Sequence, residues 1–145
     1  MRISLLVGVM IALTSLGANA QPATETSYTL PQDIRWVPDT EKPPGAFYAI
    51  LRPERRGCGG LRIQKFAGGY EFPMHVNNAY LIFTIIKGTL VLGFDEHHLR
   101  AAERQLPAGS VVQGLVTEPH YGRAVGETVF EVFGPICEPG KAPEP

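Results

Sequence analysis

Glycine and proline are frequent in this chain and restrict it to short secondary-structure elements. The 145 residues include 16 glycines and 13 prolines. The runs between them are rich in β-branched and aromatic residues, which favour strands. Runs of this kind cover residues 47–51, 61–66, 80–86, 89–93, 111–116, 120–125 and 128–133. Many short strands with little helix predict one all-β domain, either a sandwich or a barrel.

Local patterns refine this prediction in three places. Lys87-Gly88 interrupts the most apolar segment and predicts a tight turn between two strands, residues 80–86 and 89–93. Residues 61–66 alternate apolar and polar, which is typical of a strand with one face in water. Residues 96–105 have passable helical propensity, but the segment is short and is also compatible with an irregular loop.

The two ends of the chain differ from its middle. Residues 1–20 carry an early Arg2, an apolar run and small residues ending at Ala20, a pattern typical of a secretory signal peptide. The run is too short to span a bilayer. We therefore expect an exported protein, periplasmic or secreted, without a membrane segment after cleavage. Residues 21–45 are rich in proline and predict an extended arm with a short strand at 34–37, residues 46–137 form the domain, and 138–145 predict a disordered tail.

The charge balance argues against polyanionic partners. The formal net charge is −1, and it becomes about −2 once the segment with Arg2 is removed. The charges are spread without long runs of one sign. A protein of this kind has no electrostatic reason to bind nucleic acid or an anionic membrane.

The two cysteines, Cys58 and Cys137, both lie in the part expected to be exported. An even number of cysteines in an oxidising compartment favours a disulfide over two free thiols. A bridge between them would close a long loop and stabilise the fold by about 4 kcal/mol in the chain-entropy model. Sequence alone does not establish that the two Cα atoms are close enough for the bond.

Two histidines stand out because each follows a glycine inside strand-like sequence. His75 lies six residues after Gly69, and His120 follows Gly109 by eleven residues. Neutral imidazoles bind transition metals well. Because side chains two residues apart in a strand share a face, Asn77, Leu81 and Phe83 are expected to point the same way as His75. The inner wall next to His75 would then be mostly apolar.

At these two stretches the sequence resembles the cupin superfamily. Gly69, His75 and Gly88 match the first family motif, with Asn77 and Leu81 in place of its second histidine and its glutamate. Gly109 and His120 match the second motif, in which Leu115, Thr117 and Ala124 replace other motif residues. Residues 30–137 as a whole look like exported single-domain cupins similar to the cupin domain of the anti-sigma factor ChrR. The resemblance implies a jelly-roll barrel, also called a double-stranded β-helix, with an extended N-terminal arm.

The resemblance also implies where a ligand or a metal would bind. In metal-binding cupins three histidines and one glutamate hold Mn, Fe, Ni, Cu or Zn, and this chain keeps two of these four ligands, His75 and His120. Asn77 is a weak candidate third ligand, and so is Glu131, whose alternative role is a solvated outer side chain. The alternative for the two histidines is that they are buried, hydrogen-bonded remnants of a metal site.

Three functions remain open on this basis. The first is binding of a small molecule in a mostly apolar barrel pocket between His75 and His120, with a reduced or absent metal site. The second is a metal-dependent oxidoreductase, dioxygenase-like, that uses the same two histidines. The third is an interaction module that forms a homodimer through its outer sheet.

Overall fold

The computed structural model describes residues 26–55, 57–77, 79–95, 97, 103–114 and 118–136. The signal peptide and the C-terminal tail predicted from the sequence lie outside these residues. Within them, no helix has the length and apolar character needed to cross a membrane. The elements are η1 (Pro31–Asp33), β1 (Val37–Pro38), β2 (Ala46–Arg52), β3 (Gly60–Phe66), β4 (Glu71–His75), β5 (Leu81–Gly93), β6 (Arg104–Pro107), β7 (Val111–Gly114) and β8 (His120–Gly134).

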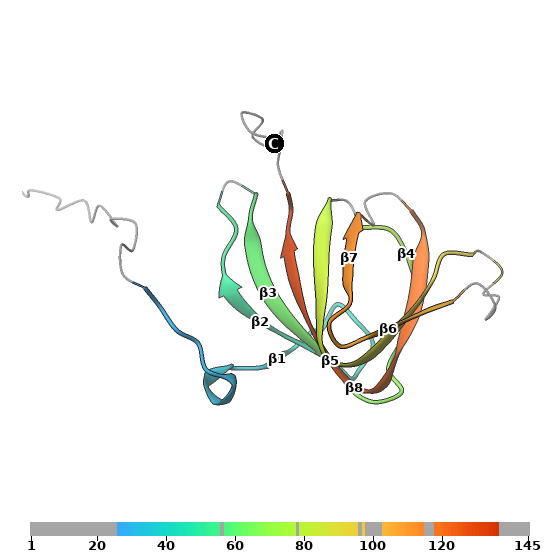
Figure 1. The fold of residues 1–145 in the computed structure, drawn as a ribbon, viewed down its shortest axis with the longest axis horizontal. Helices are drawn as coiled ribbons and strands as arrows, with labels where there is room; N and C mark the ends of the chain where they lie inside the picture. Colours follow the sequence, from blue (N-terminus) through green and yellow to red (C-terminus); the bar gives the residue numbers. More distant parts are fainter. Residues whose placement is uncertain are drawn as a thin grey trace, which may run out of the picture.

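Two long strands, β5 and β8, organise the fold. They pair with each other antiparallel along most of their length, from Ile82 opposite Phe133 to Gly93 opposite Tyr121. The first half of β5 also pairs with β7, and the last half of β8 pairs with β3, which continues through β2 to β1. The second half of β5 pairs with β6, and the first half of β8 pairs with β4. One set of strands therefore consists of β1, β2, β3 and β7 with the first half of β5 and the last half of β8, and the other consists of β4 and β6 with the remaining halves. The two sets lean apart from the bend in β5 and β8 (Figure 1). This arrangement confirms the predicted all-β jelly roll.

The bends replace turns that the sequence predicted. Lys87-Gly88 does not close a hairpin, because residues 81–93 form one strand with irregular pairing on either side of Lys87. Gly126 likewise lies inside the single strand β8, not between two strands. Gly88 has φ of 77°, and a Cβ at this position would lie 2.4 Å from the carbonyl oxygen of Glu127. The close backbone approach and the left-handed conformation explain why the bend has a glycine.

The core fills the space between the two sets of strands. Phe66 from β3, Phe83 and Leu92 from β5, and Phe130 from β8 belong to one buried cluster. Thr128 is fully buried beside the bend, where its hydroxyl donates a hydrogen bond to the carbonyl oxygen of Thr89 at 3.1 Å. Burial of the aromatic and aliphatic side chains provides the main driving force for closing the barrel.

The segments outside the barrel differ from the sequence predictions in detail. The short strand expected at residues 34–37 is β1, two residues long, and it pairs with β2 at the edge of the sheet. Trp36, next to it, lies under the amine of Lys65, whose nitrogen is 4.5 Å from the indole centroid. The polar segment before Pro107 contains a strand, β6, that the propensities did not predict. Residues 104–107 have little local preference for a strand, but their pairing with residues 89–92 of β5 outweighs this weak preference.

Candidate functional site

The two histidines singled out by the sequence face each other across neighbouring strands. His75 ends β4 and His120 begins β8, and their Cα atoms are register partners in this antiparallel pair. The ring centroids lie 4.3 Å apart. Phe72 and Phe94 pack beside them, with ring centroids 6.5 and 6.1 Å from that of His120. Residues 45 positions apart in the chain therefore form one site.

The backbone fixes both imidazoles in the same way. Nδ1 of His75 lies 3.0 Å from the carbonyl oxygen of Pro73, and Nδ1 of His120 lies 3.0 Å from that of Glu118. Because a carbonyl oxygen only accepts hydrogen bonds, each Nδ1 carries the proton. Nε2 is then the unprotonated nitrogen of each neutral ring, which is the atom that a ligand or metal would contact.

The environments of the two rings differ. His75 is exposed, whereas His120 is 2 % exposed. Burial lowers the pKa of His120; the hydrogen bond to the Glu118 carbonyl opposes this effect, and the neighbouring His75 adds to it. His120 is therefore a neutral imidazole at neutral pH.

A cavity of about 330 Å³ extends from the two histidines into the barrel. Its volume is in the range of pockets that bind small molecules. We call it the histidine cavity. Its walls come from β3, β4, β5 and β8 and from the segment before β2. It is lined by Glu41, Lys42, Pro43, Arg62, Gln64, Phe66, Phe72, Pro73, His75, Asn77, Phe83, Leu90, Leu92, His120 and Phe130.

Four of the five ligand-binding residues predicted from the sequence line this cavity: His75, Asn77, Phe83 and His120. Asn77 follows the end of β4, and its amide nitrogen lies 3.5 Å from Nε2 of His120. Leu81 lines a different, smaller cavity near the other end of β3. It begins β5 and packs into the core cluster, so the strand carries its side chain away from the histidines.

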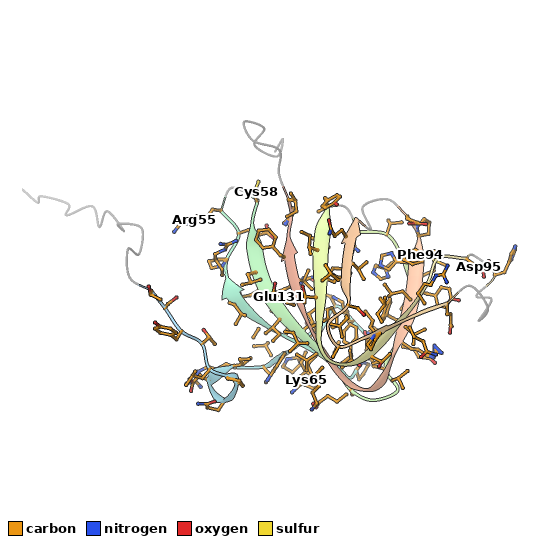
Figure 2. All side chains as sticks on the ribbon, viewed as in Figure 1. Arg55, Cys58, Lys65, Phe94, Asp95 and Glu131 are labelled. Carbon is orange, nitrogen blue, oxygen red and sulfur yellow. The ribbon has the colours of Figure 1, made fainter. Side chains whose placement is uncertain are left out.

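Glu131, the other candidate metal ligand, does not face the histidine cavity. It lies between Phe130 and Val132, which are buried in the core, so the alternation of β8 directs its carboxylate to the opposite face. Figure 2 labels it in the sheet that contains β3, away from Phe94. The proposal of Glu131 as a metal ligand is therefore corrected.

The side chains present do not match the four-ligand metal site of metal-binding cupins, which the resemblance implies. His75 and His120 supply two strong donors, Asn77 supplies a neutral amide, and Leu81 supplies none. Among the described residues, no group of three or more His, Cys, Asp or Glu side chains is placed to hold a metal ion.

The sequence did not single out two polar residues of the cavity, Arg62 and Gln64. The polar face of residues 61–66 was expected to contact water, but Gln64 is 4 % exposed and both side chains line the cavity. Leu61 and Ile63 lie on the opposite face of the sheet, where Leu61 is half-buried and Ile63 is buried. The sequence contains one indication of this orientation: alternation places the aromatic Phe66 on the same face as Arg62 and Gln64, and an aromatic side chain favours the inside of the barrel.

Neither a family model nor a curated protein matches the chain. Several solved structures, however, match the chain in fold. KdgF from Halomonas sp. is 18 % identical with a TM-score of 0.57, and the match covers 77 % of this chain and 96 % of that one. The polyketide cyclase RemF from Streptomyces resistomycificus is 15 % identical with a TM-score of 0.63, covering 79 % of this chain and 82 % of that one.

An RmlC-like cupin from Shewanella frigidimarina is 14 % identical with a TM-score of 0.58, covering 79 % of this chain and 96 % of that one. The complex of SigE with the anti-sigma factor ChrR from Rhodobacter sphaeroides also matches, as the resemblance in the sequence implied. Identities this low establish the fold and leave the function to the site. The paired halves of β5 and β8, the two facing histidines and these structural matches together show that the chain has the cupin fold.

Proposed function

We propose that this protein binds a small molecule in the histidine cavity, without a tightly held metal. The observation that carries the proposal is the cavity itself, about 330 Å³ in volume, with phenylalanine and leucine side chains in its wall and a few polar groups that converge on it. Pockets with this combination select ligands by shape and by a small number of polar contacts. Nε2 of His120 and the amide of Asn77 would supply two of these contacts.

The alternative, a metal-dependent oxidoreductase, finds less support in the donors. A catalytic metal usually has three protein ligands and an open position, and the described residues offer two imidazoles. Two well-oriented histidines favour weak metal binding at most. Elemental analysis of protein purified without a histidine tag distinguishes the two functions, because the oxidoreductase predicts about one metal per chain that is lost in His75→Ala and His120→Ala.

Export and a disulfide belong to the same proposal. Cys137 lies outside the described residues. Cys58 lies at the tip of the β2–β3 hairpin (Figure 2), and the amide of the next residue, Gly59, donates to the carbonyl oxygen of Pro135 at 2.8 Å. This contact brings the backbone next to Cys58 close to the segment that leads into Cys137. It supports the pairing of the two cysteines that the sequence predicted.

A homodimer, the third function left open by the sequence, remains compatible with ligand binding. The outer face of the β1–β2–β3–β8–β5–β7 sheet carries the half-buried Leu61, Ile82 and Phe133 and the 55 % exposed Val111, which a second copy could cover. Light scattering over a tenfold dilution series tests it. A constant monomer mass at all concentrations would contradict the dimer.

The binding function is tested by blocking the cavity. Asn77→Trp places a large side chain beside His120, and Val76→Trp, at the neighbouring exposed position outside the cavity wall, is the matched control. Thermal unfolding is measured against a panel of small aromatic and aliphatic acids, amides and alcohols. A ligand at one hundred times its Kd stabilises the wild type by about 2.7 kcal/mol. We expect this shift in wild type and Val76→Trp and its loss in Asn77→Trp; equal shifts in all three would contradict the proposal.

A further inference from the structure

Strand β3 directs two nitrogen donors into the histidine cavity without giving them acceptors. Gln64 is 4 % exposed, and its amide nitrogen has no hydrogen-bond partner among the described residues. Nε of Arg62, two residues away on the same face, is also buried, and no described residue accepts a hydrogen bond from it. A buried donor left unpaired destabilises the fold, and more so when it is charged. Two such donors side by side are available to bind an acceptor that a ligand supplies.

The charges around Arg62 show what kind of acceptor is missing. Lys42, the other cation of the cavity wall, is neutralised by Asp39 at 2.6 Å. Asp39 and Glu54 act on Arg62 through space, but the ion pairs formed within the described part of the chain do not include its guanidinium. Glu41, the carboxylate of the wall, is exposed, and water screens its charge. Arginine stays protonated, so among the described residues the cavity wall contains one cation without a direct ion pair.

The rest of the wall defines the body of the ligand. Phe66, Phe72, Phe83 and Phe130 line the cavity together with Leu90 and Leu92. Phe66 and Phe130 pack edge to face with centroids 5.0 Å apart, which gives the wall a rigid aromatic corner. A ligand that matches both parts of the cavity has one anionic end and an apolar body.

We propose that the histidine cavity binds a small monocarboxylate with an aromatic or branched aliphatic body, and that Arg62 and Gln64 bind its carboxylate. This inference rests on the proposed binding function and names its ligand class. A planar guanidinium and a neighbouring amide match the two oxygens of a carboxylate. A dianionic phosphate would leave one negative charge unpaired against this single cation. The apolar body lies along the phenylalanine wall, toward the imidazoles of His75 and His120.

The test compares acids with their neutral amides. Titration calorimetry at pH 7.5 is carried out with benzoate, phenylacetate and isovalerate, and with benzamide, phenylacetamide and isovaleramide. In the wild type we expect at least one acid to bind ten times more tightly than its amide. Arg62→Met reduces the preference to less than twofold, Gln64→Leu weakens binding of the acid severalfold, and Arg104→Met, at an exposed position of β6, preserves the wild-type preference.

The folding of the variants is checked by thermal unfolding without ligand. Arg62→Met is expected to melt at the wild-type temperature or above it, because an apolar side chain replaces a half-buried guanidinium whose Nε has no partner among the described residues. Arg62→Lys keeps the charge but loses the planar donor pair, and we expect it to restore part of the preference for the acid. If acids and amides bind the wild type equally, or if only neutral compounds bind, the carboxylate assignment is wrong and the binding function stands. If no compound of either set or of the wider panel binds, the binding function itself fails.

Discussion

His120 is a residue of the site whose ionisation the fold changes. Burial lowers its pKa below the ordinary value of about 6.5. As the pH falls through 6.5, the unfolded chain takes up a proton that the folded chain resists, so the free energy of unfolding decreases until the pH reaches the folded pKa. The contribution of His120 to stability is fully present above pH 6.5.

Urea unfolding of chelator-treated protein at pH 7.5 and pH 5.0 measures this effect. The wild type is expected to lose more stability between the two values than His120→Gln, which cannot titrate. An identical loss in both proteins would show that His120 is protonated equally easily in the folded and unfolded chains.

Single residues also show how far the sequence predicts the site. His75 and His120 were identifiable because their spacing from glycines matches a known pattern, and the structure brings their rings to 4.3 Å. Arg62 and Gln64 were missed, because Phe66 shares their face while Leu61 and Ile63 make the other face apolar as well, so alternation alone does not decide which face is inside. That choice depends on the pairing of β3 with β8, a contact between distant parts of the chain.

At the scale of the elements, the bend in β5 depends on Gly88. A Cβ at this position would lie 2.4 Å from a backbone oxygen, and backbone cannot move aside as a flexible side chain can. We expect Gly88→Ala to lower the free energy of unfolding by about 3 kcal/mol or more, since left-handed strain adds to the clash. Gly109 is the matched control: its φ is 90°, but no atom lies within 4 Å of its Cβ position.

Gly109→Ala therefore introduces the backbone strain without the clash, and we expect it to lower the free energy of unfolding by about 1–2 kcal/mol. Urea unfolding at constant pH compares the two variants. Equal losses would mean that the bend tolerates a side chain. The bend also explains the wrong hairpin prediction: Lys87-Gly88 has the composition of a turn, and only the long-range pairing of β5 with β8 makes the strand continue through it.

At the scale of the whole molecule, a bond between Cys58 and Cys137 would join the start of β3 to the segment after β8. The chain-entropy model gives about 4 kcal/mol for a loop of this length. Reduction, or Cys58→Ser, is expected to lower the free energy of unfolding by about this amount. Peptide mapping with and without reductant provides the direct measurement. A free thiol on each cysteine of protein purified without reductant, or unchanged stability on reduction, would contradict the bond.

The sharing of β5 and β8 between the two sets of strands has a consequence for how the barrel opens. Each set contains half of both strands, so two continuous backbones join the sets, and we expect them to unfold as one cooperative unit. Amide protons in both halves of β8, for example those of Ala124 and Val132, should therefore exchange with solvent deuterium at a common rate set by global unfolding. A binding cavity between two such sets has walls that persist or disappear together.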